Sequence, residues 1–201
     1  MLLTFVVTTL FMIMIPGPDA ALIMRSSLAH GRSAGMLTML GGLCGISIHA
    51  TLAAVGISAL LAASPTAFAV VQMLGIVYLL WLGVHTWLTS GRSIETVDLQ
   101  EQPTSRYQHV RRGLLSNLLN PKVLLLFVGF LPQFLPSEGE TMGSALLLSA
   151  IIGLLYALWF SFYNLLIDKI GKLLRTPKIR RRVERATGVM LVGFALSLAV
   201  Q

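Results

Sequence analysis

The sequence predicts an all-α membrane protein in which six transmembrane helices form two inverted three-helix repeats, with both termini outside. Three observations support this fold class. Of the 201 residues, 55% are hydrophobic and only 11% are charged, against roughly 25% charged in a soluble domain, and the mean hydropathy is +0.80. Charged residues separate long apolar stretches, and proline motifs recur in both halves. This composition excludes a water-soluble globule. About 20 apolar residues suffice for each crossing, so the chain has room for several spans.

The apolar stretches indicate where the helices lie. Residues 33–91 contain no Lys, Arg, Asp or Glu, and these 59 residues exceed one crossing, so Ser64-Pro65 divides them at a turn. Residues 141–167 supply a span of 27 residues, and the uncharged tail 186–201 a short one of 16. With the N-terminal segment and the apolar stretch 114–135, six helices are expected, centred near residues 12, 48, 77, 125, 155 and 192. A five-span alternative leaves the short tail at the membrane interface.

The basic residues follow alternate helices, which predicts the orientation in the membrane. Fourteen of the 15 lie after the first, third and fifth helices: Arg25, Arg32, Arg92, Arg106, Arg111, Arg112, Lys169, Lys172, Arg175, Lys178, Arg180, Arg181, Arg182 and Arg185. By the positive-inside rule these loops are cytoplasmic. The net charge of +7 therefore reports topology and contact with anionic lipid, and no nucleic-acid partner is expected.

The chain is expected to be one transmembrane transporter domain, 1–201, with a first repeat at 1–90, a cytoplasmic linker at 91–112 and a second repeat at 113–201. The halves share proline motifs: Pro16-Gly17-Pro18-Asp19 in the first helix and Asn120-Pro121-Lys122 in the fourth. Because three helices separate them, the two copies face opposite ways across the membrane. Inverted repeats with interrupted helices indicate a secondary transporter whose site lies at the repeat interface.

The prolines are expected to break both helices and to free backbone groups that lipid cannot satisfy. Each break also starts a new helix. Gly17 can serve as N-cap with Pro18 at the first helical position, and Asn120 as N-cap with Pro121 likewise. Two half-helix N-termini would then direct partial positive charge toward the interior, as anion sites do.

The residue after each proline carries the strongest functional hypothesis. Asp19 is favourable in a first helical turn, whereas Lys122 opposes the helix dipole there. A charge near the bilayer centre costs roughly 2.5 to 3.5 kcal/mol, so Lys122 needs a partner, and repeat symmetry indicates Asp19. A zwitterionic amino acid could place its carboxylate on Lys122 and its ammonium on Asp19, and a proton on Asp19 could couple export to the proton gradient.

The plain structural alternatives stay open for both charges. Asp19 could start a helix at the membrane interface, and Lys122 could reach toward the interface along its flexible stem. If the first helix continues through Arg25 to Gly31, Asp19 lies centrally instead.

Several other polar and small residues carry weaker signals. His49 is a candidate proton relay or a helix-to-helix hydrogen bond. Gly41 and Gly42 either pack against a neighbouring helix or line the cavity and contact substrate. Asn117, Gln72 and Asn164 are interpreted as packing residues rather than ligands.

The motifs together resemble the lysine exporter (LysE/RhtB) family of bacterial inner-membrane proteins. The resemblance rests on Pro16 to Asp19, the glycine-rich second helix, the Gly-x-x-Tyr-Leu-x-x-x-Gly of Gly75 to Gly83, and Asn120 to Lys122, and it covers essentially the whole chain. It implies a multi-pass transporter, not an enzyme, that exports amino acids or close derivatives, of homoserine/threonine or other neutral type, by proton antiport. The family motif positions are Pro16, Gly17, Pro18, Asp19, Asn120, Pro121 and Lys122.

Other functions are weighed against this one. A metal-cation exporter would need two or more intramembrane carboxylates or thiolates as ligands. Asp19 and Cys44 alone provide little support for such a site. A thiol-electron carrier needs paired cysteines, which a single cysteine excludes. We expect no cofactor and no resident metal; the partners are a small amino acid, protons and the lipid bilayer, and a homo-oligomer stays open.

Overall fold

The computed structural model describes residues 2–15, 17–90, 105–136, 141–167 and 176–199, and these residues are helical apart from short connections. In chain order the elements are α1 (Leu2–Met14), α2 (Pro18–His30), α3 (Arg32–Ala63), α4 (Pro65–Leu88), α5 (Arg106–Leu118), α6 (Pro121–Leu125), the π-helical turn η1 (Leu126–Phe130), the 3₁₀ turn η2 (Leu131–Phe134), α7 (Thr141–Leu165) and α9 (Pro177–Ala199). The all-helical prediction is confirmed.

Among the residues that the structure describes, three helices are long and apolar enough to cross a membrane, and two bent helix pairs, if each is one span, raise the number to as many as five. The straight candidates are α3, α4 and α7. The bent pairs are α1 with α2, at 55°, and α5 with the segment from α6 to η2, at 52°. The predicted breaks in the first and fourth helices are therefore present in the structure.

The expected sixth span, α9, does not meet the same criterion. Its first half carries Lys178, Arg181, Arg182 and Arg185, and its uncharged part runs only from Ala186 to Ala199. Fourteen residues rise about 21 Å, which is short of the roughly 30 Å hydrocarbon core. The number of six spans stays a prediction.

The predicted linker differs from the structure at its C-terminal part. Residues 91–104 lie outside the described residues, but α5 already begins at Arg106. A capping box explains the early start: the Ser105 hydroxyl accepts from the Gln108 N–H at 3.3 Å, and the Gln108 side chain accepts from the Ser105 N–H at 3.0 Å.

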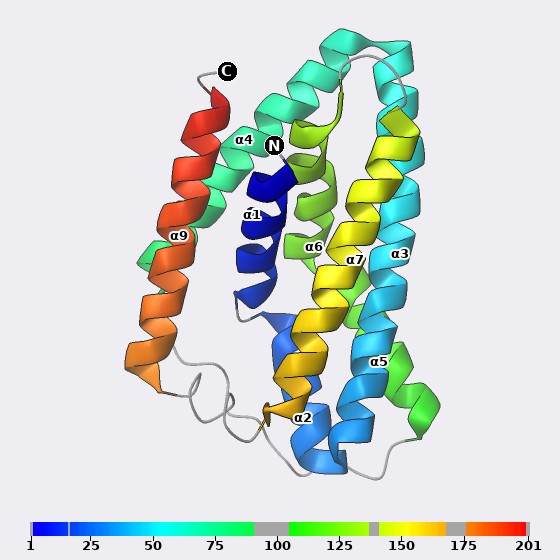
Figure 1. The fold of residues 1–201 in the computed structure, drawn as a ribbon, viewed down its shortest axis with the longest axis vertical. Coiled ribbons are helices and arrows are strands. Elements are labelled where there is room, and N and C mark those ends of the chain that lie inside the picture. Colours follow the sequence, from blue (N-terminus) through cyan, green and yellow to red (C-terminus); the bar gives the residue numbers. More distant parts are fainter. Residues whose placement is uncertain (1, 16, 91–104, 137–140, 168–175, 200–201) are drawn as a thin grey trace.

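The helices form a bundle in which both breaks lie between the two ends (Figure 1). α3 packs against α2, α5 and α7, whereas α4 packs against α9 and η1, and α1 packs against α7. The start of α1 and the end of α9 lie at the same end of the bundle, which we call the terminal end (Figure 1). The helices α3, α5 and α9 begin toward the opposite end (Figure 1), and basic residues lie in the first turn of each.

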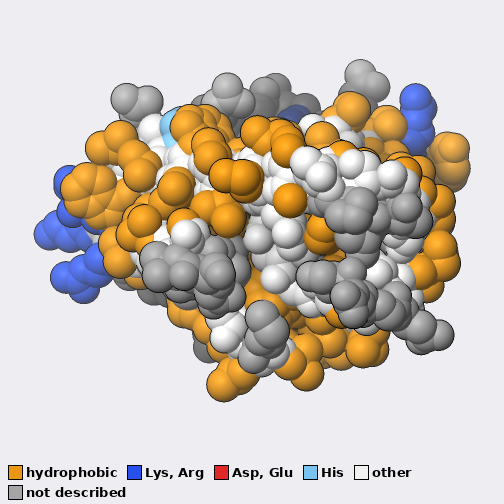
Figure 2. All heavy atoms as spheres, turned by 90° about the horizontal axis from the view of Figure 1, so that it is seen from above, with side chains coloured by type: hydrophobic (Ala, Val, Ile, Leu, Met, Phe, Trp, Pro, Cys, Tyr) orange, Lys and Arg blue, Asp and Glu red, His pale blue; other side chains and the backbone are white. Residues whose placement is uncertain are grey.

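The outer surface of the bundle is largely apolar. Exposed large hydrophobic side chains follow the outer faces of the long helices, among them Leu52, Met73, Trp81 and Leu158. Figure 2 looks onto the terminal end, where hydrophobic side chains cover much of the described surface and Lys and Arg are visible only at its edge. The apolar outer faces of the long helices suit the hydrocarbon of a bilayer.

Glycines set the closest approach between α3 and α5. A Cβ on Gly113 would overlap the backbone carbonyl of Thr38, with the carbonyl carbon at 2.8 Å. Reciprocally, a Cβ on Gly41 would lie 2.8 Å from the backbone nitrogen of Leu114. Small residues at such contacts let helix backbones pack tightly within a membrane.

We expect the Gly113→Ala variant to be less stable by about 1 to 3 kcal/mol, because the overlap is with backbone and the two helices must separate. The measurement is the unfolding midpoint in mixed detergent micelles. The matched control is Gly56→Ala on α3, where an added Cβ meets nothing within 4 Å. Equal midpoints for the two variants would contradict the close contact.

Candidate functional site

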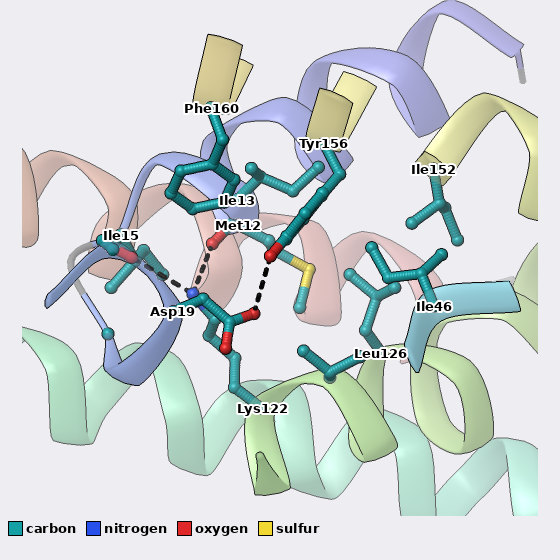
Figure 3. A pocket seen from close by; sticks show the side chains of 13 residues that line it. Met12, Ile13, Ile15, Asp19, Ile46, Lys122, Leu126, Ile152, Tyr156 and Phe160 are labelled. Carbon is teal, nitrogen blue, oxygen red and sulfur yellow. Dashed lines mark hydrogen bonds between the residues drawn. The ribbon is translucent and has the colours of Figure 1, made fainter. Parts of the chain in front are cut away.

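A buried pocket lies where the two broken helices meet (Figure 3). Its walls come from α1, α2, α3, α6, η1 and α7, and most of its lining is apolar, including Met12, Ile46, Ile152 and Phe160. Three polar side chains, those of Asp19, Lys122 and Tyr156, also line it. The cavity measures about 30 Å³, enough to hold ordered water. We call it the central pocket.

The N-cap residues and the prolines at both breaks lie where the sequence predicted them. Gly17 is the N-cap of α2 with Pro18 at its first position. Asn120 is the N-cap of α6, and its Oδ1 accepts from the Lys122 N–H at 3.0 Å. Pro16 itself lies outside the described residues, but proline has no N–H, so Met12, four residues earlier, lacks its ordinary helical donor. Both proline motifs therefore restart helices as predicted.

The Lys122 ammonium lies against the C-terminal end of α1. Its Nζ donates to the carbonyl oxygens of Met12 at 3.2 Å and Ile15 at 3.1 Å (Figure 3). The C-terminus of a helix carries partial negative charge, so a cation is stabilised there although it opposes the dipole of its own helix. A Cβ added at Gly17 would lie 3.4 Å from Nζ, an ordinary van der Waals distance, so this contact does not depend on the glycine.

The Asp19 carboxylate is held by three donors from the second half of the chain. Ser116 Oγ donates to Oδ1 at 3.0 Å, and Asn117 Nδ2 and the Tyr156 hydroxyl donate to Oδ2 at 2.7 and 3.3 Å. Asp19 is only 7% exposed. Because α2 continues to His30, Asp19 lies near the middle of the α1–α2 pair, as the sequence predicted for a first helix that runs on to Gly31.

The two charges share the central pocket, yet each forms its hydrogen bonds with other groups. The sequence led us to expect Asp19 as the direct partner of Lys122. Instead, Lys122 from the second half contacts the end of α1, and Asp19 from the first half contacts the last turn of α5 and Tyr156. Each charged side chain thus joins one half of the chain to the other, and neither needs the other as its hydrogen-bond partner.

The remaining candidates lie around the pocket rather than in its lining. Gly41 packs on α5, and a Cβ on Gly42 would overlap the Tyr156 hydroxyl, so Gly42 lets that hydroxyl approach Asp19. His49 is buried and stacks on Phe127 with ring centroids 5.8 Å apart. Gln72 donates to the Pro132 carbonyl at 2.9 Å, which is a packing contact of the kind predicted for it.

Sequence reasoning missed three residues that position Asp19. Ser116 was not singled out, and Asn117 was interpreted as a packing residue. Both lie in the last turn of α5, directly before the break, where two adjacent polar residues could have indicated the site. Tyr156 lies in a span without charged residues, and its buried hydroxyl needs a partner. No local pattern shows that this partner is Asp19, 137 residues away.

Within the described part of the chain, no three His, Cys, Asp or Glu side chains come together as a metal site would require. The polar groups of the central pocket are one carboxylate, one ammonium and one phenol.

Comparison with known proteins agrees with this architecture. The chain is 32% identical to the uncharacterized membrane protein YrhP of Bacillus subtilis, over 97% of this chain and 96% of the relative. It is 32% identical to a leucine efflux protein of Klebsiella pneumoniae, over 98% and 93% of the two chains. It is 28% identical to a homoserine/homoserine lactone efflux protein of Salmonella typhimurium, over 97% and 95%. No solved structure matches the chain.

The family model described as the LysE type translocator matches residues 10–201. This match includes both proline motifs, the central pocket and all of the helices after the start of α1. The resemblance inferred from the motifs is thereby confirmed, as is the expectation of a multi-pass protein of the bacterial inner membrane. The chain belongs to the LysE-type translocator family.

Proposed function

We propose that this protein exports a neutral amino acid with an apolar side chain across the inner membrane, in exchange for protons. The observation that carries the proposal is the central pocket, where one ammonium and one carboxylate lie among apolar walls. A zwitterionic amino acid presents the complementary charges and an apolar side chain. Relatives named for efflux of leucine and of homoserine support a neutral amino acid as substrate, and the leucine relative also supports the apolar side chain.

Substrate binding replaces the contacts that now hold the two charges. The substrate carboxylate takes the place of the Met12 and Ile15 carbonyls as partner of Lys122, assisted by the half-helix N-terminus at Pro121. The substrate ammonium takes the place of the Tyr156 hydroxyl at Asp19. The apolar side chain then lies against residues such as Ile46 and Ile152.

Transport requires the central pocket to enlarge and to open on each side in turn. Its volume of about 30 Å³ is far below the 300 Å³ or more of typical ligand sites. The two bent pairs and the two contacts that cross between the halves support an inverted repeat with alternating access. The basic residues at the end opposite the termini support cytoplasmic placement of that end.

Proton coupling in this proposal uses the same carboxylate. A proton that reaches Asp19 from outside neutralises it and releases the substrate ammonium. The protonated carrier then returns to the inward-facing state, where Asp19 loses the proton to the cytoplasm and binds the next substrate. One proton therefore enters for each cycle of export.

The test is a competition assay on purified protein in proteoliposomes. Labelled leucine is exchanged in the presence of unlabelled leucine, isoamylamine, which lacks the carboxylate, or isocaproate, which lacks the ammonium. We expect leucine to compete at least about tenfold better than either analogue, since each missing charged contact contributes about 1.5 to 3 kcal/mol. Failure of every neutral amino acid to exchange would refute the proposal, and stimulation by a divalent metal ion that is itself transported would favour metal export.

A further inference from the structure

Three buried polar side chains lie on the terminal side of the central pocket and have no hydrogen-bond partner for one polar atom each. They are Thr9 on α1, His49 on α3 and Ser149 on α7, with Oγ1, Nε2 and Oγ unpaired within the described residues. Their exposed fractions are 0%, 7% and 3%. Buried polar atoms are nearly always hydrogen-bonded, to protein or to ordered water, so three together require an explanation.

Helix register brings His49 and Ser149 to one level. α3 and α7 pack against each other and run in opposite directions (Figure 1). A Cβ on Gly153 would lie 3.8 Å from Cγ2 of Ile46. His49 is one turn further along α3, and Ser149 is one turn back along α7, so both lie one turn beyond this contact. Each belongs to the buried face of its helix.

The same reasoning places Thr9 at this level. α1 runs antiparallel to the segment from α6 to η1: Met12 contacts Lys122 near one end, and the rings of Phe5 and Phe130 stack with centroids 5.5 Å apart near the other. Thr9 lies between Phe5 and Met12, as Phe127 lies between Phe130 and Lys122. Since His49 stacks on Phe127, the three polar side chains surround one level of the bundle. We call them the polar layer.

The polar layer separates the central pocket from an aromatic cluster. Phe5, Phe130 and Phe134 form this cluster, with ring centroids 4.9 to 5.5 Å apart. In order toward the terminal end, the interior therefore contains Asp19 and Lys122, then the polar layer, then the aromatic cluster. The π-helical turn η1 forms one wall beside the layer, and such turns often occur at functional sites.

The ionisable groups on the elements around the layer are few in the described residues. α1 and η1 carry none, and α3 carries only His49 between the exposed Cys44 and its end. Tyr156 on α7, Asp19 on α2 and Lys122 on α6 line the central pocket below. On α4, which packs on η1, Tyr78 and His85 contact the exposed Trp81 instead. His49 is thus the titratable group nearest to Asp19 on the terminal side.

We infer that the polar layer holds water and passes protons to Asp19 when the aromatic cluster beyond it opens toward the terminal end, with His49 as the side chain that carries the proton. Nε2 of His49 accepts a proton from water on the terminal side and passes it through layer water to the Asp19 carboxylate, which becomes a carboxylic acid. Thr9 and Ser149 hold the water that joins the two groups. The inference rests on the proposed function, because it supplies the outer half of the proton route.

Two assays on the same proteoliposomes test the relay. The first measures exchange of labelled for unlabelled leucine at equal pH, which needs no net proton movement. The second measures accumulation of leucine driven by a pH gradient. In the His49→Gln variant, the amide nitrogen replaces Nε2 without titrating. We expect exchange within about twofold of wild type and gradient-driven accumulation lower by at least about tenfold, the scale of a lost proton-transfer group.

The hydroxyl variants keep the inference testable if His49→Gln does not fold. Thr9→Val and Ser149→Ala change little volume, and we expect each to lower only gradient-driven accumulation, by about threefold to tenfold. Ser58→Ala is the matched control, since Ser58 Oγ is also buried and unpaired but lies more than two turns along α3 from His49. This control should leave both assays unchanged.

The outcomes separate the relay from the proposed function. Gradient-driven accumulation that survives in His49→Gln, or in the combined Thr9→Val and Ser149→Ala variant, overturns the relay. If the hydroxyl variants lose both exchange and gradient-driven accumulation, the relay is also overturned, and the layer is part of the substrate path. Wild-type exchange without any gradient coupling refutes the relay and the proton exchange of the proposed function but leaves its substrate class standing. Absence of exchange in the wild type refutes the proposed function and the relay with it.

Discussion

Replacement of Lys122 by methionine is expected to weaken leucine binding by about 10- to 100-fold, because the substrate carboxylate loses a charge-assisted hydrogen bond of about 1.5 to 3 kcal/mol. Methionine has nearly the length of lysine without the charge. The carbonyls of Met12 and Ile15 lose their donor at the same time. The measurement is the leucine concentration that half-saturates exchange in proteoliposomes.

The amine analogue separates this effect from a general loss of structure. Isoamylamine has no carboxylate to meet Lys122, so its competition should be unchanged or stronger in Lys122→Met. Gly17→Ala is the matched control at the same contact, because the added Cβ would lie 3.4 Å from Nζ, an ordinary van der Waals distance. Weakened competition by isoamylamine to the same degree as leucine would show that Lys122 acts through the fold and not through the carboxylate.

The Asp19→Asn variant is expected to show the opposite selectivity. Binding of leucine and of isoamylamine should both weaken by about 10- to 100-fold, since the ammonium loses its charged partner, while isocaproate should compete as it does in the wild type. Exchange and gradient-driven accumulation should fall together, unlike in the His49 variant. The measurements are the two proteoliposome assays with the three competitors.

The surroundings of Asp19 can accept this change without unfolding. Asn117 donates to Oδ2 through its amide nitrogen, whereas its Oδ1 has no partner in the described residues. A half-turn of the Asn117 side chain would present Oδ1 to the new amide. The free energy of unfolding should therefore stay within about 1 kcal/mol of wild type. The control is Ser116→Ala, which removes one of three donors to Asp19 and should leave the charge selectivity intact.

The broken helices and their caps could be predicted because their causes are local. A proline has no N–H wherever it lies, and Gly17 and Asn120 precede prolines that start helices. Tracts of uncharged residues likewise identify α3, α4 and α7 as apolar helices of membrane length. The start of α5 was misplaced because Arg106, Arg111 and Arg112 resemble a loop by charge, although the Ser105–Gln108 capping box begins a helix there.

The partners of the charged residues could not be predicted in the same way. Lys122 contacts a carbonyl 110 residues away, and Asp19 contacts a hydroxyl 137 residues away. Repeat symmetry correctly indicated that both residues face one interior, but it indicated each as the other's partner. The structure shows instead that a half-helix end and three side-chain donors provide those contacts.

By itself the sequence determined the membrane class, the positions of the two breaks, and the placement of one acid and one base directly after a proline. These follow from hydropathy and backbone chemistry, which act within a few residues along the chain. Only the tertiary structure decided that Lys122 lies on the end of α1, that Tyr156 reaches Asp19, and that Thr9, His49 and Ser149 share a level. Those contacts depend on the register between packed helices, and a register is set by side chains that are distant in the sequence.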